Sequence, residues 1–243
     1  HILLSNTTVA TSNAGWSGRG DLATVVFDSK MWVLGGNNAH GTCSTTLKND
    51  VWYSTDGANW TRATSSAGWS ARNSHRAVVF DNKMWVMGGG RSCCSGSNGT
   101  GYNDVWYSTD GANWTRATSN VAFSGRGGIG LTTFNSKMWV IGGWGASEFS
   151  DVWYSTNGAS WTQSTSNLGA GSHDHSAAST SSMLWVFGGD YGRSNLAWYS
   201  SDGIAWTSMN FPSGTYNRSD SNNVFFDGTI WLAEANKVWK LKY

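Results

Sequence analysis

The sequence predicts an all-β fold, a five-bladed β-propeller of four-stranded antiparallel blades, from three observations. The fifteen residues DVWYSTDGANWTRAT at 50–64 recur unchanged at 104–118, and with substitutions at 151–165 and 196–210. A Trp-Val-x-Gly-Gly motif precedes each copy, and its tryptophan recurs at a period of roughly 50 residues, which is typical of a propeller blade. The composition, with 17 Trp, 31 Gly and one Pro, suits short strands joined by tight turns.

Each repeat is expected to form four short strands, A to D. In the second repeat they are placed at 75–80, 83–87, 104–108 and 114–118. Asp81-Asn82 and the segment 109–112 have the residue types of tight turns between strands A and B and between strands C and D. The tryptophans of the Trp-Val motif, with the fifth repeat included, are Trp32, Trp85, Trp139, Trp185 and Trp231.

The fifth repeat stops after three strands, at 223–226, 229–233 and 237–242. The missing strand D is predicted at the other end of the chain, because residues 6–16 align with residues 59–69 of the first repeat. We therefore expect a single domain over 1–243, whose last blade consists of 217–243 and 1–11. Such closure of the ring by the N-terminal strand would remove exposed sheet edges.

Charge and hydropathy exclude two classes of function. A formal net charge of +1 with 13% charged residues gives no basic surface for nucleic acid. No apolar run approaches the ~18 residues of a membrane-spanning helix. The chain begins at His1, is rich in Ser, Thr and Asn, and has glycosylation sequons at Asn6 and Asn98. These features predict a secreted, extracellular protein.

The repeats resemble those of the Kelch family. The resemblance rests on the Gly-Gly doublet after strand B, the aromatic strand C, the Trp that follows it, and Arg72-Asn-Ser-His75 at the start of a strand A. It covers nearly the whole chain and implies a β-propeller, although five blades are fewer than the family's usual six or seven. The Ser-Thr-Asp-Gly-Ala-Asn-Trp turn also resembles the sialidase Asp-box, which is a structural turn and implies no catalysis.

The two faces of the predicted ring differ in how much their loops vary. The C–D turns are nearly identical, whereas the B–C connections at 37–49, 90–103, 144–150 and 190–195 share little. Binding residues concentrate on loops held by a rigid scaffold, so the face formed by the B–C and D–A connections is the expected binding face. Relaxed constraint on these loops would produce the same variation.

Four arginines share the position at the start of strand A: Arg19, Arg72, Arg126 and Arg218. The fourth repeat has Ser172 there. Together the four guanidinium groups could bind an anion at the mouth of the ring. The alternative is that each arginine braces its own blade.

The fourth repeat also departs from the others in His173 and Asp174, while His175 aligns with His75. Asp174, together with Asp21 and Asp220, is expected near the channel mouth, where three carboxylates could serve a glycoside-processing enzyme. The two histidines could ligate a metal, but their spacing is a weak indication. We therefore predict no catalytic residue, no metal and no cofactor.

The three cysteines fall in neighbouring B–C loops. Cys43, Cys93 and Cys94 are candidates for a disulfide that joins these loops. With His40 they could instead bind a soft metal, and the odd cysteine leaves a bond to another chain open.

The function predicted from these features is a non-catalytic, lectin-like module that binds a glycan or a glycosylated surface. Trp144, Tyr191 and Tyr102 would stack on sugar rings. Polar contacts would come from Arg91, Asp190, Arg193, His173, Asp174 and His175. The alternative is a protein-interaction or structural-assembly subunit, as in adhesion or filament formation, that binds a partner protein or self-associates. Neither nucleic acid nor membrane insertion is expected.

Overall fold

The computed structural model describes residues 10–38, 47–90, 101–165, 167–168, 173–189 and 196–210, and the backbone of 222–226, 229–234 and 237–240. Within these ranges the chain forms β-strands that pair in antiparallel sheets. In the part of the chain so described, there is no helix of the length and hydropathy needed to cross a membrane.

Four sheets have four strands each, in chain order, and we name them blades one to four. Blade one consists of β1 (Ala23–Phe27), β2 (Lys30–Asn37), β3 (Leu47–Ser54) and β4 (Thr61–Thr64). Blade two consists of β5 (Asn73–Phe80), β6 (Lys83–Gly90), β7 (Val105–Ser108) and β8 (Thr115–Thr118). Blade three consists of β9 (Gly130–Phe134), β10 (Lys137–Trp144), β11 (Glu148–Ser155) and β12 (Thr162–Thr165). Blade four consists of β13 (Ser176–Ser179), β14 (Leu184–Phe187), β15 (Leu196–Ser200) and β16 (Thr207–Asn210).

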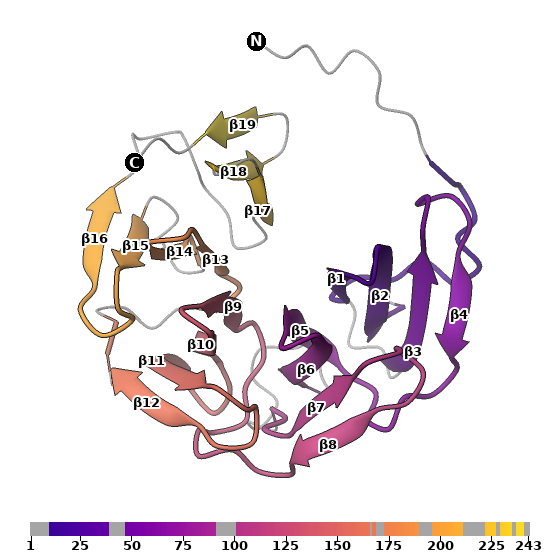
Figure 1. Ribbon diagram of the computed structural model, residues 1–243, viewed down its shortest axis with the longest axis horizontal. Helices are drawn as coiled ribbons and strands as arrows, with labels where there is room; N and C mark the ends of the chain where they lie inside the picture. The colour runs from indigo at the N-terminus through magenta and orange to yellow at the C-terminus, as the bar shows by residue number, and fades with distance from the viewer. Residues whose placement is uncertain are drawn as a thin grey trace.

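A further sheet contains β17 (Asn222–Phe226), β18 (Thr229–Glu234) and β19 (Lys237–Lys240). The sheets follow one another along an arc, with the first strand of each blade on the inside (Figure 1). Inner strands of successive sheets are neighbours, β1 with β5, β5 with β9, β9 with β13, and β13 with β17. The all-β prediction and the four-stranded sheet from each of the first four repeats are confirmed.

In blade two β6 runs to Gly90, beyond the predicted strand at 83–87, and β2 and β10 likewise continue past their Gly-Gly doublets. In blade one, β2 runs through the Gly-Gly doublet to Asn37, and its register with β3 shifts between Leu34 and Gly36. Gly35 and Gly36 have φ values of 58° and 99°, a left-handed backbone that residues with a Cβ adopt at a cost. The doublet is therefore a bulge inside the strand and not its end.

The core lies between adjacent blades and depends on a repeated contact between a tryptophan and a glycine. Trp32 of blade one packs with Met84 of blade two, and its indole lies against Gly111 in the C–D turn of blade two. A Cβ on Gly111 would be 2.0 Å from Cζ3 of Trp32, so the ring occupies the place of a side chain. The same contact joins Gly158 to Trp85 and Gly203 to Trp139. The C–D turns of blades two, three and four thus pack onto the preceding blade.

The C–D turns are held by local hydrogen bonds. In blade one the Oγ of Ser54 accepts from the N–H groups of Asp56 and Gly57, and the Oδ1 of Asp56 accepts from those of Ala58 and Asn59. The N–H and side-chain donors of Asn59, with the N–H of Ala58, hold the pKa of the Asp56 carboxyl well below its usual value. These bonds give the repeated aspartate a structural role in the turn.

Candidate functional site

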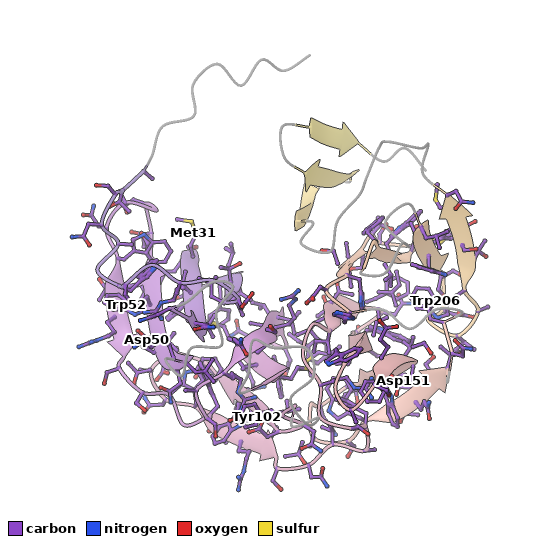
Figure 2. The ribbon with its side chains drawn as sticks, turned by 180° about the vertical axis from the view of Figure 1, so that it is seen from behind. Met31, Asp50, Trp52, Tyr102, Asp151 and Trp206 are labelled. Carbon is purple, nitrogen blue, oxygen red and sulfur yellow. The ribbon has the colours of Figure 1, made fainter. Side chains whose placement is uncertain are left out.

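Each described arginine of the strand-A position is buried in its own blade and paired with an aspartate. The side chain of Arg72 has no exposed area, and its guanidinium donates to both carboxylate oxygens of Asp104, at 2.8 and 3.0 Å. It also donates to the carbonyl oxygens of Gly88 and Ser70. Equivalent pairs join Arg19 to Asp50 and Arg126 to Asp151, and Figure 2 places the two aspartates in separate blades.

This pairing favours the interpretation that each arginine braces its own blade. Burial would raise the pKa of Asp104, but the hydrogen bonds and positive charge of Arg72, helped by the indole N–H of Trp106, hold it below its ordinary value. Blade four supports the same interpretation, because both partners are replaced there together. Ser172 stands at the arginine position and Leu196 stands at the aspartate position. Arg218 lies outside the described residues.

Aromatic side chains from the B–C connections cover two of these ion pairs. The ring centroid of Tyr102 lies 4.0 Å from the guanidinium carbon of Arg72, and that of Phe149 lies 3.8 Å from that of Arg126. Such cation–π contacts take up one face of each ring. Tyr102, expected to stack on a sugar, therefore has one ring face against Arg72.

At the junction of blades three and four, four side chains form what we call the His173 cluster: Trp144, Glu148, His173 and Asp174. Trp144 ends β10 and Glu148 begins β11, while His173 and Asp174 precede β13. The Nδ1 of His173 is 3.5 Å from the Oε1 of Glu148, and its Nε2 is 3.7 Å from the Oδ2 of Asp174.

The indole of Trp144 completes the cluster, with its ring centroid 5.2 Å from that of His173. The imidazole is buried, whereas the side chains of Glu148 and Asp174 are 28% and 36% exposed. The arrangement presents two carboxylates and a half-buried indole to solvent, with a histidine held between them. Such a surface is chemically suited to a cationic group.

Asp21 and Asp174 belong to a chain of backbone hydrogen bonds that passes from blade to blade. The N–H of Ser74 donates to the carbonyl of Asp21, that of Gly128 to Ser74, and that of Asp174 to Gly128, at 2.9–3.0 Å. All four residues have φ between 51° and 60°, the left-handed region that Gly and Asp tolerate best. We call these four residues the backbone belt.

The left-handed backbone of the belt explains why aspartate occurs at Asp21 and Asp174, two of the three positions considered for glycoside-processing chemistry. Ser74 and Gly128 lie between Asp21 and Asp174 along the belt, so the two carboxylates come from blades that are not adjacent. Asp220 lies outside the described residues.

His75 and His175 are both buried, and neither is presented to solvent. A Cβ on Gly130 of blade three would lie 2.6 Å from the Nε2 of His175, so this imidazole packs between blades. Burial, with the positive charges of Arg72 and Arg76, lowers the pKa of His75 to about 3. Within the described ranges, no three His, Cys, Asp or Glu side chains are grouped as metal ligands.

Several predicted site residues fall outside the described residues: Arg91, Asp190, Tyr191 and Arg193, and the cysteines Cys43, Cys93 and Cys94. Conversely, Glu148 was not among the residues predicted from the sequence. Its only indication in the sequence is that it follows Trp144 in the short third B–C connection. Loop lengths differ between blades, so alignment of the repeats could not place it beside His173.

Comparison with known families follows the same repeat units. A family model described as the KLHDC2/KLHL20/DRC7 Kelch-repeats domain matches residues 4–189 of the 243-residue chain. No curated protein matches the sequence. The match covers all of blades one to three and the first half of blade four, including the three arginine–aspartate pairs and the Gly-Gly bulges. The resemblance noted in the sequence is thereby confirmed, and the chain belongs to the family of Kelch-repeat domains.

Proposed function

We propose that this protein is a protein-interaction module that binds its partner on the face formed by the B–C and D–A connections. The observation that carries the proposal is the His173 cluster, where the repeat is broken on that face. At the position of His173, blades one and three have glycine and blade two has the buried Asn73. Membership of the Kelch-repeat family supports the proposal, because such domains mediate contacts between proteins.

The chemistry of the His173 cluster favours a partner that presents lysine or arginine. Glu148 and Asp174 supply negative charge beside the indole of Trp144, and a cation near an aromatic face gains from both. The net charge of the whole chain is +1, so this attraction is local to the cluster. Both carboxylates are partly exposed, so a cationic group of the partner can contact them directly.

Glycan binding in an extracellular setting is less well supported by the same geometry. Of the three aromatic residues expected to stack on sugars, Tyr102 covers Arg72 and Trp144 packs beside His173. The third, Tyr191, lies outside the described residues. A glycan array probed with the intact protein tests this candidate independently.

A photo-crosslinking amino acid tests the proposed face. Incorporated in place of Ser147, an exposed residue beside Glu148 in the same connection, it should capture one partner protein, and the control replacement of Ile204 should not capture it. Ile204 is an exposed residue in a C–D turn of blade four. Capture at position 147 should weaken in E148Q and D174N, since both substitutions remove charge and asparagine tolerates the left-handed φ of residue 174. Equal capture at both positions, or a glycan-array signal without capture, would contradict the proposal.

We also infer that the sheets form a closed five-bladed ring, with a last blade from 217–243 and 1–11. The entry of the chain into blade one supports this inference. Trp16 meets Trp60 edge-on, with ring centroids 4.8 Å apart, as Trp69 meets Trp114 at 5.9 Å where the chain enters blade two. Trp69 follows strand D of a blade, so the segment before Trp16 is expected to be such a strand. The β17–β19 sheet has three described strands, and this segment would be its fourth.

A further inference from the structure

One side of blade one exposes apolar residues that are covered in the other blades. We call Val26, Met31 and Gly57 the flank of blade one. Val26 is 71% exposed and Met31 is 37% exposed, whereas Met84 and Met138, at the same position as Met31, have no exposed area. In Figure 2 Met31 lies at the edge of blade one, on the side towards the β17–β19 sheet.

The equivalent residues are buried because each meets the tryptophan of the preceding blade. Met84 and Met138 share clusters with Trp32 and Trp85, respectively. The same indole also contacts the glycine in the C–D turn of the methionine's own blade. A Cβ on Gly111 would lie 2.0 Å from the ring of Trp32, and a Cβ on Gly158 would lie 2.0 Å from the ring of Trp85. Gly57 has the same left-handed backbone, with φ of 75°, but the atom near its Cβ position is Cε of Met31, at 3.2 Å. The flank therefore presents the two features that hold an indole in blades two and three, a methionine at this strand position and a left-handed glycine in the C–D turn.

We propose that the flank of blade one binds Trp231 of β18 in the same chain. The register of the β17–β19 sheet places Trp231 opposite Val224, as Trp32 lies opposite Val25 and Trp85 opposite Val78. Trp231 is thus the fifth and last tryptophan of the series, and Gly57 of the flank is the C–D glycine with no indole of a preceding blade beside it among the described residues. This inference goes beyond partner binding and rests on the closed ring proposed above.

Glycine at position 57 is the feature that makes the site selective for an aromatic ring. The atoms nearest a Cβ at the three established contacts belong to the six-membered ring of the indole. A smaller side chain would leave a cavity there, and a residue with a Cβ at position 57 would clash with the indole. A second copy of the chain offers the same residues but would require two molecules to meet.

Methionine oxidation by dilute peroxide, followed by mass spectrometry, tests the proposal on the full chain. Met84 and Met138 serve as buried references in the same sample. Met31 should oxidise as slowly as these references in the wild type, and about tenfold faster in W231A, because sulfoxide formation requires access to the sulfur. If peroxide oxidises all three methionines rapidly in W231A, that variant has unfolded. G57A is then used instead, as the variant expected to expose Met31 alone.

Fast oxidation of Met31 in the wild type at every protein concentration would overturn the proposal. Protection that appears only at high concentration would overturn it as well, because it would assign the flank to a second copy. The readout does not involve Trp144 or the partner. Exposure of Met31 together with specific crosslinking at position 147 would reject the Trp231 contact and leave the proposed function standing.

Discussion

Acid should destabilise this protein through His75, and replacement of His75 by leucine should remove that effect. His75 is fully buried, with its ring centroid 5.6 Å from that of Trp69. Burial, followed by the charges of Arg72 and Arg76, lowers its pKa from 6.5 to about 3. Blades one and three have Leu22 and Ile129 at this position, so the fold accepts an aliphatic side chain there.

The size of the effect follows from the two pKa values. Because the pKa is lower in the folded state, the folded chain stays unprotonated at pH values where the unfolded chain binds a proton. Stability is therefore full above the unfolded pKa of 6.5 and is lost progressively as the pH falls towards 3. Between about pH 7 and about pH 4.5, this one group should lower the free energy of unfolding by about 2.5 kcal/mol.

Urea unfolding of the wild type and H75L across this pH range measures the effect. The other histidines and the carboxylates are common to both proteins, so the difference between the two pH profiles isolates residue 75. The free energy of unfolding of H75L should fall less with acid than that of the wild type, by about 2.5 kcal/mol at the lower pH. Parallel profiles for the two proteins would refute the assignment of a neutral, buried imidazole at this position.

Two further stability predictions concern the repeated contacts. G111A should lower the free energy of unfolding by about 2–4 kcal/mol, because its Cβ would clash with Trp32 and because alanine is strained in the left-handed backbone of this position. G18A is the matched control, because a Cβ on Gly18 meets no atom within 4 Å, and equal urea midpoints for the two variants would contradict the tryptophan–glycine contact. R72S and D104L should each cost about 3–5 kcal/mol by removing one partner of a buried ion pair. The double variant, which has the residue types of blade four, should lower the free energy of unfolding by at least about 1.5 kcal/mol less than the two single variants added together. Additive losses would refute the interpretation that Arg72 and Asp104 brace the blade as a pair.

The sequence predicted the scaffold well because the scaffold is what repeats. Alternating strands, turn residues and the Gly-Gly doublet recur at fixed spacing, so one blade could be interpreted from another. The alignment also showed that strand-A arginine and strand-C aspartate are both absent from blade four. It did not show that they are partners, because Arg72 and Asp104 are 32 residues apart and meet only once the sheet has formed.

The candidate site was harder to predict because its residues do not repeat. His173 and Asp174 were visible as departures from the repeat, but Glu148 comes from another blade and a loop of different length. For Asp21 and Asp174, the sequence suggested chemistry where the structure shows a left-handed backbone position. Residue type alone could not separate these two roles, since aspartate suits both.

The most direct test of the whole account is the affinity of the crosslinked partner for variants on the two faces of the protein. The repeated C–D turns are assigned to the scaffold, and the His173 cluster is assigned to recognition. E148Q and D174N should each raise the dissociation constant by about tenfold at low salt, with a smaller effect at high salt, as expected for charge pairs. I204A, in a C–D turn, should leave it unchanged. Loss of affinity in I204A, with E148Q and D174N still binding as tightly as the wild type, would contradict the account.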